Sequence, residues 1–217
     1  MTARGTRIAV VSVCVVLAVA GTQAALLLRG SHQTRTRVPD GSSPVGQEDL
    51  ETLLARVARP LDPKLRTQLA EAVLSESARG GYDPLFILGL VSVESGFRPH
   101  VSSERGAYGL MQLQPSTFAW IAGREPDIGD GAAVSEDPVI DVRLAVRYFA
   151  WLERRFPRRE EALMAYNAGP SRLHRYKRAR IPSTVRDYPR KVMREYSRFA
   201  RILGRPDPRG VILARAD

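Results

Sequence analysis

The sequence predicts an all-α protein domain, and three observations support this fold class. Apolar residues recur at helical spacing, first at Leu50, Leu53 and Leu54 and then repeatedly along the chain. A capping aspartate stands directly before a proline, a favourable way to start a helix, at Asp62, Asp83 and Asp137. No strand pattern, hairpin signal or internal repeat interrupts these helical segments. We therefore expect a multi-helix domain.

The individual helices follow from the same signals in chain order. An apolar helix that begins at Pro84 should end at Gly96, because glycine readily takes the left-handed conformation that closes a helix. We expect the other helices at about residues 50–57, from 63 onward, and at 115–123, 138–156, 159–166, 171–176 and 190–203.

The first part of the chain indicates export. Arg4 and Arg7 precede a run from Ile8 to Leu28 that carries no charge and could span a bilayer as a helix. Residues 1–29 are therefore predicted to be a signal-anchor or a signal peptide, with Ala18-Val19-Ala20 as a possible cleavage site in the second case. Residues 30–48 are polar and read as a flexible linker, which leaves 49–217 as the folded domain.

Composition narrows the chemistry. Cys14 is the only cysteine, which excludes an internal disulfide and a cysteine-based metal cage. His32, His100 and His174 lack metal-ligand spacing, so we expect no metal and no cofactor. The net charge is +10 and comes largely from arginine. This arginine content can reflect a GC-rich genome, or it can serve an anionic partner.

Glu94 is the unusual residue of the predicted helix that begins at Pro84. It shares a helical face with Leu90 and Ile87, so a carboxylate stands one turn beyond apolar neighbours. Desolvation favours the neutral, proton-bearing form of a carboxyl group, and a glycosidase needs such an acid to protonate the leaving oxygen. The alternative is a glutamate near a helix end that simply reaches water.

Two further segments carry polar groups suited to a sugar ligand. Gly106–Gln112 reads as a loop whose backbone approaches another group closely, and Gln112 supplies an amide donor and acceptor. Ala165–Gly169 places the Tyr166 phenol and the Asn167 amide at a helix end. Each segment alone is equally compatible with an ordinary turn or a helix cap.

Taken together, Glu94-Ser95, Gly109–Gln112 and Ala165–Gly169 resemble, in this order and spacing, the catalytic domain of soluble murein lytic transglycosylases, which belong to the lysozyme-like superfamily. The resemblance covers about residues 65–203, and Ile181–Tyr188 resembles the C-terminal motif of that family. The sequence departs from the family pattern in a few places. These are Gln114 in place of a common Met, Thr184-Val185 in place of Glu-Thr, and Pro189 in place of Val.

The resemblance implies a lysozyme-like α-helical domain with a groove that binds peptidoglycan. In such a domain Glu94 would act first as acid on the β-1,4 bond between N-acetylmuramic acid and N-acetylglucosamine, and then as base on the muramic C6 hydroxyl, giving a 1,6-anhydro end. The N-acetyl group of the sugar would stabilise the positive centre, so no second carboxylate is required. The implied substrate-binding residues are Ser103, Gly109, Met111, Gln112, Tyr166, Asn167 and Tyr188.

Rival functions remain on the same sequence. Hydrolysis by a goose-type lysozyme mechanism is the nearest, and a non-catalytic peptidoglycan-binding module is the second. Nucleic-acid binding would use the positive charge, but export removes the chain from most nucleic acid. We expect a monomer on the periplasmic or cell-envelope side, anchored in the inner membrane through the N-terminal helix if this helix is not cleaved.

Arginines gather in the last third of the chain. They can form an ordinary solvated face, or they can attract carboxylates of the wall or acidic lipid, and both attractions would weaken with salt. The residues concerned are Arg154, Arg155, Arg158, Arg159, Arg172, Arg175, Arg178 and Arg180.

Overall fold

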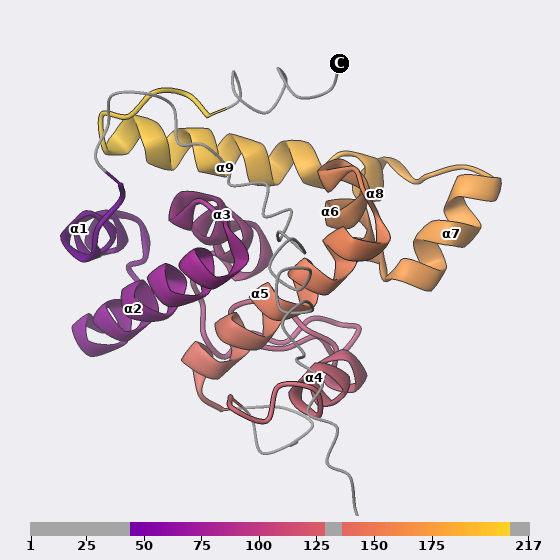
Figure 1. The fold of residues 1–217 in the computed structure, drawn as a ribbon, viewed down its shortest axis with the longest axis horizontal. Coiled ribbons are helices and arrows are strands. Elements are labelled where there is room, and N and C mark those ends of the chain that lie inside the picture. The colour runs from indigo at the N-terminus through magenta and orange to yellow at the C-terminus, as the bar shows by residue number, and fades with distance from the viewer. Residues whose placement is uncertain (1–43, 129–135, 209–217) are drawn as a thin grey trace, which may run out of the picture. The chain divides into compact units, whose positions relative to one another are not determined.

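The computed structural model describes residues 44–128 and 136–208. Within these two ranges the chain forms helices and no strand, with two isolated bridges between residues 102 and 113 (Figure 1). The helices are α1 (Gln47–Val57), α2 (Pro63–Gly80), α3 (Pro84–Ser95), α4 (Pro115–Ala122), α5 (Pro138–Arg155), α6 (Arg159–Ala168), α7 (Pro170–Arg178), α8 (Ser183–Arg186) and α9 (Tyr188–Ile202).

The predicted N-terminal segment 1–29 lies outside the described residues, as does the linker up to residue 43. Among the helices of the described ranges, none combines the length and the apolar character that a bilayer crossing requires. The first helix begins at Gln47, whereas the sequence predicts a folded domain from residue 49.

The predicted helix starts at the three Asp-Pro pairs are confirmed. The side chains of Asp62, Asp83 and Asp137 each accept a hydrogen bond from a backbone N–H of the first turn, at 2.9, 2.8 and 2.8 Å. Gly96 ends α3 in the left-handed conformation with φ 59°, as the sequence predicts. The local sequence therefore sets the ends of the helices that carry the site.

Helix α3 is buried along nearly its whole length and packs most extensively against α9. Gly89 allows this close approach, because a Cβ atom at this position would lie 3.1 Å from the backbone oxygen of Val192. On the other side of the core α2 packs against both α1 and α5, and α5 contacts α6. Helix α3 also contacts α2, so it lies between α9 and α2.

Two differences from the predicted helices bear on the site. The short helix α8 was not predicted, and α9 begins at Tyr188 instead of Arg190. Pro189 explains the earlier start of α9, because proline fits the first turn of a helix, where its missing N–H costs nothing. This start matters for the site, since it places Tyr188 at the N-terminal end of a rigid helix.

Candidate active site

Glu94 lies in the last turn of α3, and the backbone fixes its position. Gly96 and Phe97 both have positive φ, 59° and 62°, and turn the chain sharply away from the helix axis. This conformation is unfavourable for a phenylalanine. It is stabilised here because the Phe97 ring is buried against Phe199, with ring centroids 6.2 Å apart. The chain reversal directly after Glu94 is therefore anchored in the core.

Tyr188 is the hydrogen-bond partner of Glu94. The buried Tyr188 hydroxyl donates to Oε1 of the partly buried Glu94 carboxyl group. Burial raises the pKa of Glu94 to about 7, the hydrogen bond from Tyr188 lowers it, and the negative charge of Asp141 raises it. A carboxyl group with this pKa carries its proton for a large part of the time near neutral pH, as a general acid must.

The glycine-rich loop at Gly109–Gln112 is held by Asp141, near the start of α5. The Asp141 carboxylate accepts a hydrogen bond from the backbone N–H of Met111, with 2.8 Å between N and Oδ2, and a further one from the N–H of Leu110. Gly109 has φ +83°, and a Cβ atom there would lie 2.5 Å from Oδ2 of Asp141. Only glycine fits this position, for both reasons.

Asp141 was missed in the sequence analysis. It is 4% exposed, and burial raises its pKa to about 7, while the hydrogen bonds from Met111 and Leu110 lower it. A signal was available, because Asp141 shares helical spacing with Leu144 and Tyr148 on the buried face of α5. The site thus contains a second buried carboxyl group, engaged in holding a loop.

Tyr166 connects the loop to α6. Its hydroxyl donates to the backbone oxygen of Met111 at 2.8 Å. Burial and the nearby charges of Glu94 and Asp141 raise the pKa of Tyr166 well above its ordinary value, so the phenol stays protonated. Asn167, the next residue, is exposed near the C-terminal end of α6.

Gln112 and Ser103 stabilise loop conformation. Gln112 has φ 50°, and its side-chain amide donates to the backbone oxygens of Val101 and Gly109 at 2.9 and 3.0 Å. The exposed Ser103 hydroxyl accepts from the N–H of Ala107 at 3.0 Å. The amide oxygen of Gln112 and the hydroxyl proton of Ser103 remain available for other partners.

The structure thus brings Tyr188, Tyr166 and the Gly109–Gln112 loop together around Glu94 and Asp141. Met111 is fully buried, and its backbone N–H and C=O both bind neighbours, so its side chain belongs to the core. Contact of Met111 and of the other predicted binding residues with substrate stays a prediction. Within residues 44–128 and 136–208, no group of His, Cys, Asp and Glu is arranged to hold a metal ion.

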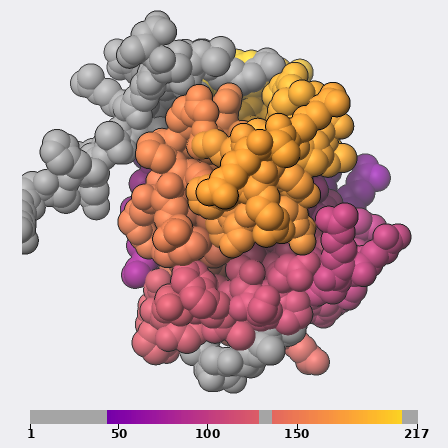
Figure 2. Space-filling view, turned by 90° about the vertical axis from the view of Figure 1, so that its right-hand side faces the viewer, coloured from indigo at the N-terminus to yellow at the C-terminus, as the bar shows by residue number. Residues whose placement is uncertain are grey.

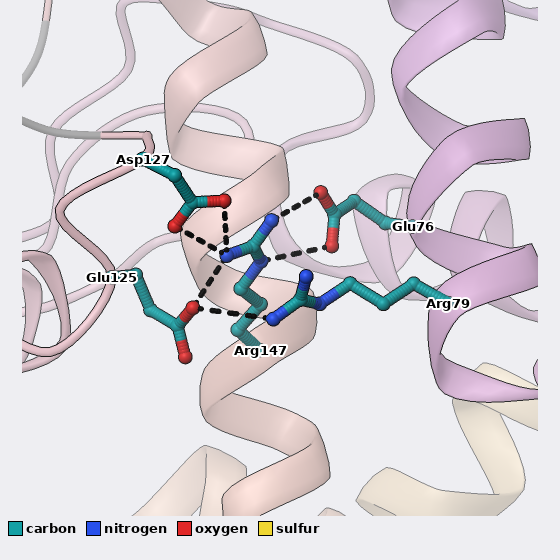
Figure 3. A network of polar contacts seen from close by, with 5 residues as sticks. All are labelled: Glu76, Arg79, Glu125, Asp127 and Arg147. Atoms are coloured by element: carbon teal, nitrogen blue, oxygen red, sulfur yellow. Dashed lines mark hydrogen bonds and ion pairs between the residues drawn. The ribbon is translucent and has the colours of Figure 1, made fainter.

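A second cluster of charged side chains, of which Glu76 and Arg147 are buried, is centred on Arg147 of α5 (Figure 3). Arg147 donates to Glu76 on α2, at 3.1 and 3.2 Å, and to Glu125 and Asp127 in the segment after α4. Arg79 adds an ion pair with Glu125 at 3.6 Å. A pocket of about 380 Å³ adjoins this cluster. Each of the three carboxylates pairs with an arginine, and the cluster joins α2, α5 and the segment after α4.

Comparison with known proteins agrees with this geometry. Residues 71–186 match the family model of the Transglycosylase SLT domain. The endo-type membrane-bound lytic murein transglycosylase A from two strains of Klebsiella pneumoniae is 37% identical over 78 residues, which are 35% of this chain and 38% of the relative. The chain thus matches well under half of the length of these relatives.

Two solved structures share the fold. Lytic transglycosylase Slt from Pseudomonas aeruginosa, in an inactive mutant form, has a TM-score of 0.56 and 22% identity over 73% of this chain and 30% of its own. The 70 kDa soluble lytic transglycosylase of Escherichia coli has a TM-score of 0.55 and 19% identity over 78% of this chain and 32% of its own. These structures confirm the predicted lysozyme-like helical fold. The family match extends over more than half of the chain, which therefore belongs to the Transglycosylase SLT domain family.

Proposed function

We propose that this chain is a peptidoglycan lytic transglycosylase. It cleaves the β-1,4 bond between N-acetylmuramic acid and N-acetylglucosamine and leaves a 1,6-anhydromuramic end. The observation that carries the proposal is the Glu94 carboxyl group, whose pKa is raised to about 7 by burial and which sits beside Tyr188. The family membership and the name of the Klebsiella relatives support the substrate class.

The reaction uses Glu94 twice. Protonated Glu94 gives its proton to the glycosidic oxygen, the C1–O bond breaks, and the N-acetylglucosamine side leaves as an alcohol. The Glu94 carboxylate then takes the proton of the muramic C6 hydroxyl as its oxygen bonds to C1. The proton balance closes, no water is consumed, and Glu94 returns to its acid form. A pKa near 7 suits a group that must give and take a proton in one cycle.

Tyr188 and Asp141 have opposite effects on the pKa of Glu94. The Tyr188 hydroxyl stabilises the carboxylate by donating to it, whereas the charge of Asp141 destabilises the carboxylate. Asp141 accepts backbone N–H groups from the loop, so its role is to hold the loop and it is not placed as a second nucleophile. This arrangement supports the single-carboxylate mechanism over hydrolysis with two catalytic carboxylates.

We further propose that the protein acts in the cell envelope as a monomer. The charge-free run at residues 8–28 would hold it at the inner membrane, on the periplasmic side. The description of the Klebsiella relatives as membrane-bound supports the envelope location.

The test is mass analysis of the products released from purified sacculi. The proposal predicts muropeptides with 1,6-anhydromuramic ends, and reducing ends would establish hydrolysis instead. The Glu94→Gln variant should lose at least about a hundredfold in rate, because it has no proton to give. A variant of Glu104, an exposed acid in the loop that precedes Gly109, is the matched control and should keep its activity. Full activity of Glu94→Gln would refute the proposal.

A further inference from the structure

Helix α7 presents an unusual concentration of unpaired positive charge. Residues 162–186 contain no Asp or Glu. Four exposed arginines of this segment form no ion pair within the described part of the chain, and they are Arg172, Arg175, Arg178 and Arg180. By contrast, Lys177 on the same helix pairs with Glu161 at 2.9 Å. The arginines thus face solvent, with their charge available to a partner.

Three of these arginines are spaced so that they lie in a line along α7. Arg172, Arg175 and Arg178 follow at intervals of three and lie along one side of α7, a row about 9 Å long at 1.5 Å per residue. Leu173 is buried and fixes the opposite side of the helix. We call the three residues the arginine row.

The arginine row begins close to the candidate active site in the chain. Helix α6 carries Tyr166 and ends at Ala168, and α7 starts at Pro170 after the single residue Gly169. Helix α7 also packs against α6. Figure 2 shows this face, where the orange surface of the α7 region lies above the pink surface of residues from about 100 to 128. The arginine row thus follows directly on the helix that carries Tyr166.

We propose that the arginine row binds carboxylate groups of the peptidoglycan substrate, on the peptide stems attached to the strand being cleaved. This inference rests on the proposed function and names a second contact for the same substrate. Guanidinium groups fit carboxylates in a two-bonded fork, which supports arginine in this role. A membrane surface is the less suitable partner, because Leu173 is buried and α7 offers no exposed aliphatic side chain for insertion.

The experiment measures binding to sacculi by co-sedimentation, with the full chain carrying Glu94→Gln so that the polymer stays intact. In this background Arg172, Arg175 and Arg178 are changed together to Gln. The matched control changes Arg56, Arg59 and Lys64 together to Gln. Arg56 lies in α1, Arg59 after it and Lys64 in α2, and all three are exposed and form no ion pair in the described ranges. Both triple variants lose the same net charge, so only the position of the charge differs.

The arginine-row variant should bind sacculi about tenfold more weakly at low salt, with the difference shrinking at high salt, whereas the control should change by less than about twofold. Sacculi whose carboxyl groups have been converted to amides should no longer distinguish the variants. Equal binding by the two triple variants would overturn the inference. The inference would also be overturned if the arginine-row variant lost binding to phosphatidylglycerol vesicles but bound sacculi as before. That result would assign the arginine row to the membrane.

This test separates the inference from the proposed function. Binding is measured with an inactive chain, so the outcome does not depend on cleavage. If the active chain released no anhydro products while the arginine row still bound sacculi, the proposed reaction would fail and the binding surface would stand. If anhydro products formed and both triple variants bound sacculi equally, the surface would fail and the reaction would stand.

Discussion

The carboxylates on the two faces of α5 differ in whether an arginine pairs with them. On one face Arg147 forms ion pairs with Glu76, Glu125 and Asp127, and the hydrogen bond from Arg147 lowers the pKa of Asp127 (Figure 3). On the other face Asp141 lies near Glu94, and burial raises the pKa of each to about 7. No described ion pair compensates either of these two acids. Ion pairing thus marks the structural face, and its absence marks the face where a proton can be transferred.

The largest effect is expected on the paired face. Replacing Arg147, which is 9% exposed, by Met leaves Glu76 buried at 2% exposure without its cation. Loss of one partner of a buried pair costs about 3–5 kcal/mol of unfolding free energy. Urea denaturation at pH 7 measures this loss. Arg79→Gln is the control and should cost less than about 1 kcal/mol, because the Arg79 side chain is 58% exposed. Similar losses of unfolding free energy for Arg147→Met and Arg79→Gln would show that the buried ion pair is not the stabilising contact.

On the unpaired face, removing the acid should stabilise the protein. Because the folded pKa of Glu94 is raised from 4.5 to about 7, the folded state binds the proton more tightly than the unfolded state, and stability falls as pH rises through this window. Glu94→Gln should therefore gain up to about 3 kcal/mol at pH 8. At pH 4 the ionisation gives no difference. Thermal denaturation of the variant and of the parent protein at both pH values checks this. If the stability of the variant relative to the parent were lower at pH 8 than at pH 4, the expectation would be wrong.

The contact between Gly109 and Asp141 can be tested with two glycines. Gly109→Ala should cost about 2 kcal/mol or more, because the new Cβ would both strain the backbone at φ +83° and collide with the Asp141 carboxylate. Gly106→Ala is the matched control. Gly106 has φ +77° but nothing within 4 Å of the added atom, so only the backbone strain of about 1 kcal/mol applies. Equal losses in denaturation would show that Asp141 does not confine the loop.

The smallest effects are shifts of the pH profile. The hydrogen bond from Tyr188 lowers the pKa of Glu94, so Tyr188→Phe should move the alkaline fall in activity to higher pH. The charge of Asp141 raises the pKa of Glu94, so Asp141→Asn should move the same fall to lower pH. Rates of sacculus solubilisation between pH 5 and 9 measure both. Shifts in the same direction would contradict the assigned influences.

Much of the fold could be predicted from the sequence, because its signals are local. Asp83 before Pro84 and Gly96 after Ser95 mark the ends of α3 by capping and by left-handed backbone, and the structure has both. The short helix α8 and the early start of α9 were not predicted. Four residues are too few for a helical repeat to show, and the packing of α8 against α6 and α9 stabilises it instead.

The site could be predicted only in part. Tyr188 was implied as a site residue by the motif resemblance, and the structure shows its hydroxyl hydrogen-bonded to Glu94. Asp141 was missed because it reads as a first-turn acid of α5, a common helix-start feature, while its partners Leu110 and Met111 lie about thirty residues earlier in the chain. Such a long-range contact leaves no local pattern. The same holds for Arg147 and Glu76, which are 71 residues apart.

The central claim is that Glu94 holds its proton near neutral pH. Carbon-13 NMR of the side-chain carboxyl groups tests it directly, with Glu94→Gln identifying the signal by its loss. We expect this signal to titrate with a midpoint near pH 7, far above the ordinary glutamate value of 4.5. A midpoint near 4.5 would mean that Glu94 is ionised at neutral pH, and it would contradict the assignment of Glu94 as the catalytic acid.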